Sequence, residues 1–265
     1  MRFIKMHGIG NDYVFVDCFH ESLPKEPAEL AVEVSRPHFG VGADGLILIG
    51  PGRDCDARMR VFNADGSEAR MCGNGIRCVG KYLYDSGLCR KPTLTIDTPS
   101  GVKALQLTIE GGRCTGATVD MGEPVLNGAV TVHAAGRAWT LERVSLGNPH
   151  AVAVLPELPE DALFGAAGPA IERDPAFPDR ANVEFVRVAA PDALQMRVWE
   201  RGSGETLACG TGACAALVAC AQAGRSARAA RVNLKGGALD IEWKRNNHIY
   251  MTGPAVTVFT GEWVI

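Results

Sequence analysis

The stretch MRVFNADGSEARMCGNG at residues 59–75 recurs as MRVWERGSGETLACGTG at residues 196–212, at an offset of 137 with no gap. Seven of the 17 positions are identical, among them a cysteine, which is Cys72 in the first copy and Cys209 in the second. Self-similarity at a fixed offset is the mark of a duplicated structural unit. The repeat therefore predicts that the chain consists of two related halves.

The same offset holds outside this stretch. Gly10-Asn11 matches Gly147-Asn148, Tyr13 matches His150, and GLILI at 45–49 matches NVEFV at 182–186. Three separate segments that share one offset argue against a chance match. The turn-rich stretch GGRCTG at 111–116 lies near the midpoint, which predicts an N-terminal lobe of residues 1–116 and a C-terminal lobe of residues 117–253.

The periodicity of the chain is that of an α+β protein. Many short alternating or β-branched runs, separated by turn signals about every 8–12 residues, predict strands. Two helices stand out, CGNGIRCVGKYLYDSG at 72–87 and CGTGACAALVACAQAG at 209–224; both are largely apolar, which predicts burial, and both end at a glycine. We therefore predict two pseudo-symmetric, strand-rich lobes, each wrapped around a central helix.

The composition excludes several classes of partner. There are 27 Lys and Arg against 30 Asp and Glu, and aromatic residues make up 6%, which argues against nucleic-acid binding. The longest apolar stretch, 213–221, is too short to span a membrane. The N-terminal sequence has neither the apolar core nor the cleavage site of a signal peptide. These features predict a protein of the cytoplasm, a compartment in which thiols stay reduced.

The nine cysteines do not have the spacing of a metal site. No two of them are three residues apart, so the CxxC pairs typical of zinc sites are absent. A lone GxG is weak support for a nucleotide, and no lysine-centred cofactor pattern is present. We expect neither a metal nor a cofactor.

The two repeated cysteines lie at the predicted starts of helices, and this position favours a reactive thiol. Free backbone N–H groups and the positive end of the helix dipole stabilise a thiolate there, and they also attract a carboxylate. For one copy alone, a turn with a cysteine that fills the core explains the pattern equally well. Two symmetric copies favour a pair of thiols that removes a proton from a carbon on one face and delivers a proton to the other.

Four segments resemble those of the diaminopimelate epimerase family, in order along essentially the whole chain: GIGNDYVFVD (8–17), FNADGSEARMCGNGIRC (62–78), LGNPHAV (146–152) and ERGSGETLACGTGACA (200–215). The resemblance implies a cofactor-independent, two-base enzyme that interconverts LL- and meso-2,6-diaminopimelate on the route to lysine and peptidoglycan precursors. It also implies an active site in the cleft between the two lobes, and a final strand, within 254–265, that returns to the N-terminal lobe.

The resemblance assigns roles to individual residues. Cys72 and Cys209 would be the acid/base pair, with His150 and Glu200 beside the thiols to tune their ionisation. The groups at the helix starts that hold the reacting carboxylate would be Gly73, Asn74, Gly210 and Thr211. The other substrate contacts would be Asn11, Asn63, Asn148, Asn182, Glu200 and Arg201. A guanidinium suits a carboxylate of such a substrate and a glutamate suits an ammonium group. Phe259 would contact a second subunit in a homodimer.

One position departs from the family, and two alternatives remain. Gly45 stands where some members carry a glutamine that contacts substrate, and glycine offers no side chain for this. The first alternative is another isomerase of the same fold, such as the proline racemase type, which typically has a histidine where Asn74 stands and lacks the ERGSGET run. The second is a thiol redox or metal-binding protein, which the missing CxxC disfavours.

Overall fold

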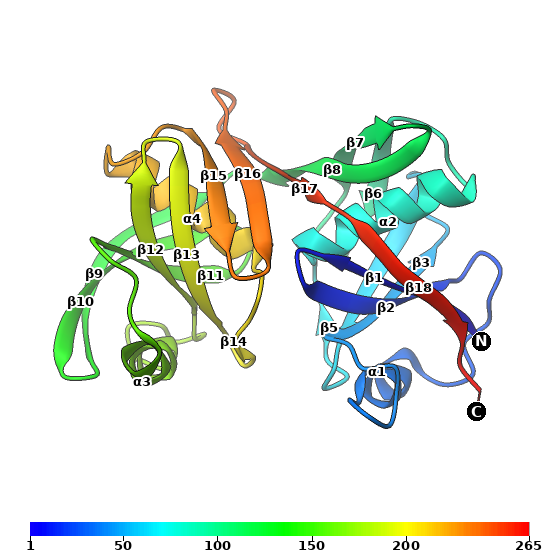
Figure 1. Ribbon diagram of the computed structural model, residues 1–265, viewed down its shortest axis with the longest axis horizontal. Coiled ribbons are helices and arrows are strands. Elements are labelled where there is room, and N and C mark those ends of the chain that lie inside the picture. Colours follow the sequence, from blue (N-terminus) through cyan, green and yellow to red (C-terminus); the bar gives the residue numbers. More distant parts are fainter. Residues whose placement is uncertain (265) are drawn as a thin grey trace. The chain divides into compact units, whose positions relative to one another are not determined.

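The computed structural model of the chain describes residues 1–264 and divides it into two compact units (Figure 1). The first unit comprises Met1–Val119 and the segment from Thr252 onward, and the second comprises Asp120–Met251. The chain passes between the units twice, within β8 (Arg113–Gly122) and within β17 (Ile249–Pro254), and these two strands pair with each other.

The first unit is rich in strands and has two helices. Its remaining elements are β1 (Arg2–Gly8), β2 (Asn11–Asp17), α1 (Pro27–Ser35), β3 (Gly45–Gly50), β4 (Ala57–Asn63), β5 (Glu68–Ala69), α2 (Gly73–Ser86), β6 (Thr93–Asp97), β7 (Lys103–Glu110) and β18 (Val256–Glu262). The final strand, β18, pairs antiparallel with β1.

The second unit has the same composition of elements. They are β9 (Val125–Ala134), β10 (Arg137–Ser145), β11 (Pro149–Leu155), α3 (Asp161–Glu172), β12 (Asn182–Ala190), β13 (Ala193–Glu200), β14 (Gly204–Glu205), α4 (Gly210–Gln222), β15 (Ala229–Leu234) and β16 (Gly237–Trp243).

The two units repeat one strand register. In the first unit β2 runs parallel to β3, with Val14 opposite Leu46, and in the second β11 runs parallel to β12, with Ala151 opposite Val183. Both pairs of residues differ by 137. The next strand is antiparallel in each unit, and Ile47 opposite Val61 corresponds to Glu184 opposite Val198. The predicted duplication is therefore confirmed at the level of individual residue pairs.

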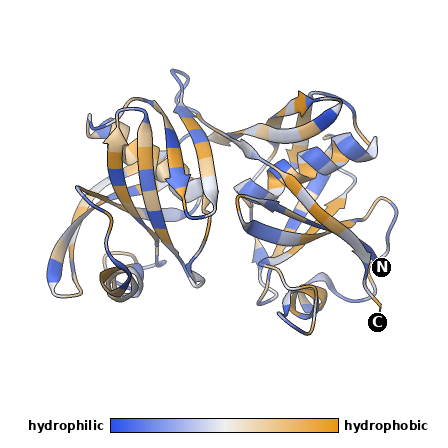
Figure 2. Cartoon of the chain, in the orientation of Figure 1, coloured by the Kyte–Doolittle hydropathy of each residue, from blue (hydrophilic) through white to orange (hydrophobic). Residues whose placement is uncertain are grey.

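The two predicted helices are confirmed, and they differ in burial. The first ten residues of α4, except Thr211, are buried, and this helix contacts β10–β13, β15 and β16. In α2 the first eight residues and Leu83 are buried, whereas the other residues of the last turns are partly or fully exposed, so the expected burial holds for only part of this helix. Lys81 and Asp85 form a partly buried ion pair of 2.7 Å in those turns, and both side chains bond to the backbone of Cys114 on β8. Figure 2 shows the difference, since α2 alternates between hydrophobic and hydrophilic residues.

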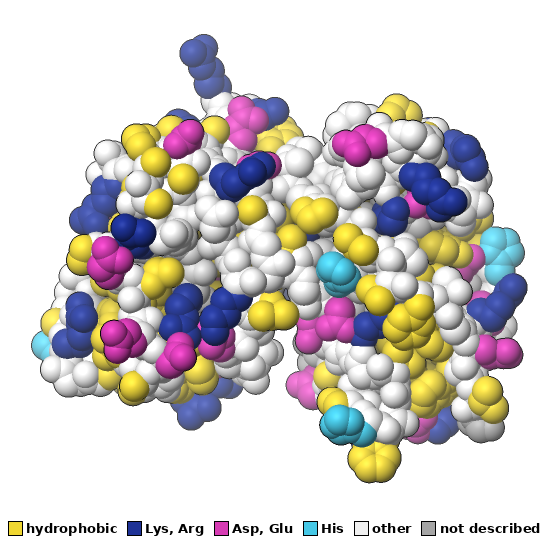
Figure 3. Space-filling model, in the orientation of Figure 1, with side chains coloured by type: hydrophobic (Ala, Val, Ile, Leu, Met, Phe, Trp, Pro, Cys, Tyr) yellow, Lys and Arg dark blue, Asp and Glu magenta, His cyan; other side chains and the backbone are white. Residues whose placement is uncertain are grey.

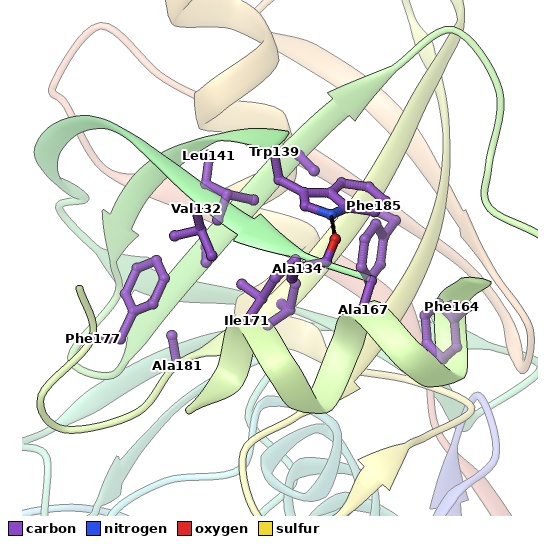
Figure 4. Packing of buried hydrophobic residues seen from close by; sticks show 13 residues of the cluster. Val132, Ala134, Trp139, Leu141, Phe164, Ala167, Ile171, Phe177, Ala181 and Phe185 are labelled. Atoms are coloured by element: carbon purple, nitrogen blue, oxygen red, sulfur yellow. Dashed lines mark hydrogen bonds between the residues drawn. The ribbon is translucent and has the colours of Figure 1, made fainter. Parts of the chain in front are cut away.

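The core of the second unit fixes the direction in which β12 presents its side chains. Phe185 packs edge-on against Trp139 and Phe164, with ring centroids 5.2 and 5.3 Å away, and the Trp139 indole N–H donates to the Ala134 carbonyl at 2.9 Å (Figure 4). Successive side chains of a strand point to opposite faces. Because Phe185 faces this core, Glu184 faces the opposite side, where α4 lies.

The surface carries charges of both signs. Figure 3 shows acidic and basic side chains interspersed on the visible face of the molecule. In the described part of the chain, no helix has the length and apolar character needed to cross a membrane.

Candidate active site

Cys72 is the N-cap of α2, as the sequence predicts. Its sulfur accepts a hydrogen bond from the backbone N–H of Gly75 at 3.3 Å, and the thiol donates to Asn11 Oδ1, also at 3.3 Å. Asn74 Nδ2 donates to the same oxygen at 3.3 Å. The structure thus brings Cys72, Asn11 and Asn74 into one cluster at the start of the helix.

Two charged groups, one of them on α2 itself, fix the two amides. Asn11 Nδ2 donates to Asp44 at 2.7 Å. Asn74 is 2% exposed, and its Oδ1 accepts from the guanidinium of Arg77, which is fully buried and also donates to the Pro254 carbonyl at 3.1 Å. Because their orientations are set in this way, the amides present defined donors and acceptors beside the thiol.

Tyr13 completes the surroundings of Cys72. Burial raises the pKa of its phenol well above the ordinary value, and interactions with Cys72 and Asp44 raise it further. The phenol therefore stays neutral at physiological pH. Sequence reasoning did not single out Tyr13 as a site residue, although the 137-residue offset placed it opposite His150.

Asn63 and Gly45 lie side by side on adjacent strands. Asn63 donates to the Ser67 hydroxyl at 3.0 Å, within the turn between β4 and β5. A Cβ atom on Gly45 would lie 2.1 Å from the Phe62 carbonyl oxygen. This close approach explains why position 45 has no side chain here, unlike the family members that carry glutamine.

Cys209 is the N-cap of α4 and is 5% exposed. Its sulfur accepts from the backbone N–H of Gly212 at 3.4 Å and lies 3.6 Å from Thr211 Oγ1. Burial, followed by the charges of Glu200 and Glu184, raises the pKa of this thiol well above its ordinary value, while the bonds from Thr211 and Gly212 act in the opposite direction. Burial and the two carboxylates therefore outweigh the expected preference for a thiolate at the start of the helix.

Glu200 is the carboxylate that interacts most strongly with Cys209. Burial raises the pKa of Glu200, whereas hydrogen bonds with the Thr206 hydroxyl and the Cys209 thiol lower it. The raised pKa makes Glu200 a stronger proton acceptor than an ordinary carboxylate, and it is hydrogen-bonded to the thiol.

His150 lies in the same unit and is hydrogen-bonded on both ring nitrogens. Its Nδ1 is 2.7 Å from Glu184 Oε1, and its Nε2 is 3.1 Å from Asn148 Oδ1. Asn148 Nδ2 in turn donates to Thr211 Oγ1 at 3.2 Å. Sequence reasoning missed Glu184. Its signal was a single carboxylate in the apolar strand NVEFV, at the position where the first half has Ile47.

Asn182 and Arg201 shape the loop after β13. The Asn182 amide donates to the Pro149 carbonyl at 3.2 Å, and its Oδ1 accepts from the backbone N–H of Arg201 at 3.0 Å. The Arg201 guanidinium is exposed and donates to the Asp179 carbonyl at 3.0 Å. Gly210 is buried in the first turn of α4 beside Cys209, as Gly73 is in α2 beside Cys72.

Phe259 makes its ring contact at the N-terminal strand of its own unit. It is on β18, is 45% exposed and packs edge-on against Phe3, with ring centroids 6.0 Å apart. Across residues 1–264 no group of three or more His, Cys, Asp or Glu side chains is arranged to hold a metal ion.

Comparison with solved structures gives the fold. A probable proline racemase from Agrobacterium radiobacter K84 superposes with a TM-score of 0.75 at 16% identity, over 100% of this chain and 93% of that one. A PhzF-family phenazine biosynthesis protein from Bacillus anthracis superposes with a TM-score of 0.74 at 18% identity, over 100% and 99%. Both confirm a fold of two strand-rich lobes.

Comparison with sequence families is more specific. The family model "Diaminopimelate epimerase" matches residues 3–127 and 143–258. A diaminopimelate epimerase from Acetivibrio thermocellus is 51% identical over 99% of this chain and 98% of its own length. One from Desulfovibrio desulfuricans is 49% identical over 100% and 99%. The chain belongs to the diaminopimelate epimerase family.

Proposed function

We propose that the protein interconverts LL- and meso-2,6-diaminopimelate by proton transfer at one α-carbon, with Cys72 and Cys209 as the two acid/base groups. The observation that carries this proposal is the pair of equivalent N-cap thiols, each in the sequence context of the family. The relatives with this name are about half identical over their full length.

The reaction needs one thiolate and one thiol. The thiolate takes the α-proton, so that a C–H bond breaks and an S–H bond forms. The thiol on the other face then gives its proton to the carbon. No electron is gained or lost, and the proposed mechanism uses no pyridoxal phosphate or other cofactor. While the carbon lacks its proton, negative charge moves onto the adjacent carboxylate, and N–H groups at a helix start stabilise such charge.

The neighbours of each thiol support distinct roles. Glu200 is the acceptor that converts Cys209 to a thiolate, because the thiol donates to it and its own pKa is raised. Asn11 and Asn74 are oriented by Asp44 and Arg77, which suits them to hold polar groups of the substrate near Cys72. Arg201 is an exposed guanidinium that suits the carboxylate of the centre that does not react.

Turnover of LL-diaminopimelate tests the proposal, with proline and glutamate as control substrates. We expect deuterium from solvent at the α-carbon without added cofactor. Cys72→Ala and Cys209→Ala should each lower kcat by at least about 10²–10⁴-fold, because each removes one proton-transfer group. Cys220→Ala, a buried cysteine farther along α4, is the matched control and should retain activity. Full turnover by either active-site variant would refute the two-base mechanism.

We also propose a homodimer that uses β18. Three of its apolar side chains are exposed, Val256 by 40%, Val258 by 54% and Phe259 by 45%. A second copy of this chain is the partner proposed to cover them. Light scattering after size exclusion should show a dimer for the parent protein and a monomer for a Val258→Asp/Phe259→Asp variant. Thr257→Asp, which adds one charge to the same strand, is the control. A monomeric parent protein would contradict the proposal.

We place the enzyme in the cytoplasm, because a mechanism that depends on two thiols requires a compartment that keeps them reduced.

A further inference from the structure

Glu184 is a buried carboxylate that the proposed mechanism does not use. It is fully buried on β12, and within the described chain its Oε2 has no hydrogen-bond partner. Its Oε1 lies 2.7 Å from the equally buried His150 Nδ1. An uncompensated buried charge is strongly unfavourable. A carboxylate with this one partner is therefore best stabilised when the imidazole is positively charged.

The other side of His150 fits the same protonation state. Its Nε2 lies 3.1 Å from the side-chain oxygen of Asn148, which can only accept. An acceptor at each ring nitrogen is the arrangement that an imidazole with hydrogen on both nitrogens satisfies. A neutral imidazole bonded to Glu184 through Nδ1 would instead have to accept at Nε2, which requires the Asn148 amide to turn over.

Two further contacts connect Asn148 to Cys209 through Thr211. Asn148 Nδ2 donates to Thr211 Oγ1 at 3.2 Å, and the Cys209 sulfur lies 3.6 Å from the same oxygen. With Asn148 as its donor, the Thr211 hydroxyl can donate its own hydrogen to that sulfur. A hydrogen bond donated to sulfur favours the thiolate. If the amide turned over, Thr211 would donate to Asn148 and accept from the thiol, which favours the protonated form.

We propose that Glu184 is a positioning residue that keeps His150 doubly protonated. The chain of side chains Glu184, His150, Asn148 and Thr211, named here the Glu184 chain, thereby directs a hydrogen bond onto the sulfur of Cys209. The proposal deepens the proposed function and rests on it only in taking Cys209 as one of the two bases.

Two carboxylates face Cys209, Glu184 on β12 and Glu200 on β13, and His150 on β11 acts on both of them. A Cβ atom on Gly212 would lie 2.7 Å from Glu184 Oε1 and 3.2 Å from the Cys209 sulfur, so the carboxylate is also close enough to repel a thiolate directly. Direct repulsion and the Glu184 chain act on the thiol in opposite directions, and an experiment can separate them.

The first unit has no such chain. At the offset of 137, Ile47 stands for Glu184 and Tyr13 for His150, while Asn11 and Asn74 take the places of Asn148 and Thr211. At these two positions the described part of the first unit therefore carries neither a carboxylate nor an imidazole. Cys72 is therefore an internal control in every sample.

The experiment follows two titrations in substrate-free protein. NMR of isotope-labelled histidine reports His150, and iodoacetamide alkylation with peptide mass spectrometry reports Cys209 and Cys72. In Glu184→Gln, the midpoint for His150 should fall by about one pH unit or more, because its counter-charge is gone. The alkylation midpoint of Cys209 should rise, and that of Cys72 should not move. Glu172→Gln removes another buried carboxylate of the second unit, on α3, and should leave all three midpoints unchanged.

Two results would overturn the proposal. An unchanged His150 midpoint would show that Glu184 does not hold the imidazolium. A lowered His150 midpoint with a Cys209 midpoint that stays or falls would show that Glu184 acts on the thiol only by repulsion.

Thr211→Val provides an independent check by breaking the last bond of the Glu184 chain. It should raise the Cys209 midpoint and leave that of His150 unchanged, and Glu184→Gln added to it should cause no further rise. A further rise would contradict the chain. Since none of these titrations requires turnover, failure of the epimerase assay and failure of this inference are distinguishable.

Discussion

The two cysteines occupy equivalent positions but have unlike neighbours. Asn11, Asn74 and Tyr13 lie beside Cys72, whereas two carboxylates, Glu200 and Glu184, lie beside Cys209. The backbone contact is the same in both units, an N–H from the third residue along the helix. The duplication therefore preserved the position of the sulfur, while side-chain substitutions changed the groups that surround it.

Glu200→Gln tests the role of the carboxylate beside Cys209. The folded pKa of Glu200 is raised, so ionisation is less favourable in the folded than in the unfolded state. The resulting loss of folding stability is absent when the pH is below the pKa of Glu200 in the unfolded chain. It is complete when the pH is above the pKa of Glu200 in the folded protein. At pH 7 the variant should be more stable by about 1 kcal/mol, which raises Tm by roughly 2–4 °C, and the gain should vanish in acid. Its kcat should fall by about 10²-fold or more. A variant with unchanged kcat would contradict the role of proton acceptor.

Asp17→Asn tests a carboxylate with the opposite shift. Burial raises the pKa of Asp17, but hydrogen bonds from His20, Tyr82 and the Phe19 N–H outweigh it, and the net pKa is lowered. Its stabilisation is present above the unfolded pKa and is lost as pH falls through the folded value. Urea unfolding at pH 7 should show a loss of about 1–3 kcal/mol that disappears at low pH. Asp54→Asn, in an exposed loop, should change little, and a loss independent of pH would argue against the charge.

At the scale of single elements, α2 and α4 are predictable and α1 and α3 are not. The repeat, the N-cap cysteines and the terminal glycines all indicate α2 and α4. The sequence of α3, DALFGAAGPAIE, contains two glycines and an internal proline, which argue against a helix. Packing of Phe164 and Ile171 into the core of the second unit overrides that local preference. The nine residues of α1 are too few to show a clear helical periodicity of apolar residues.

The same limits apply to the site. A repeated cysteine before a glycine predicts a helix start from local sequence alone, and the neighbours of Cys72 follow from the family resemblance. Glu184 depends on tertiary structure instead. Because neighbouring side chains of a strand alternate, the inward position of Phe185 places Glu184 towards α4. Only the fold shows that Glu184 is fully buried there and that His150 lies beside it.

Two glycines of α3 provide a matched pair of substitutions. A Cβ atom on Gly165 meets nothing within 4 Å, whereas one on Gly168 would lie 2.8 Å from the Trp199 ring. Gly165→Ala should stabilise the protein by about 0.5–1 kcal/mol, through lower chain entropy in the unfolded state. Gly168→Ala should destabilise it by about 1–3 kcal/mol, because the indole has to move. Equal effects in thermal unfolding would show that α3 does not pack on Trp199 as described.

For the molecule as a whole, the first unit is built from both ends of the chain. The Met1 amino group donates to the Trp263 carbonyl at 3.0 Å, and the Trp263 N–H donates to the Met1 carbonyl at 2.7 Å. The fully buried Arg77 donates to the Pro254 carbonyl. The second unit is one continuous segment inserted between these parts.

This arrangement predicts how the first unit can be isolated. The fragment 1–119 alone should not fold, because β1 loses its pairing with β18 and the buried Arg77 loses an acceptor, which alone costs about 1–3 kcal/mol or more. A permuted chain that begins at Thr252 and joins Trp263 to Met1 through Asn-Gly should fold. The two joined strands are antiparallel, with Arg2 opposite Glu262, and Asn-Gly favours the tight turn of a hairpin.

Circular dichroism and urea unfolding of the two first-unit chains give the measurement, and the continuous fragment 120–251 is the control for autonomous folding of a half. A cooperative transition for the permuted chain and none for 1–119 is the expected result. It follows from where the hydrogen-bond partners of the first unit lie, since β18 supplies an entire strand edge and a carbonyl for a buried cation. If 1–119 unfolds cooperatively with the same midpoint as the permuted chain, the returning strand adds nothing to the stability of the first unit, and the account of its fold given by the β1–β18 pairing is wrong.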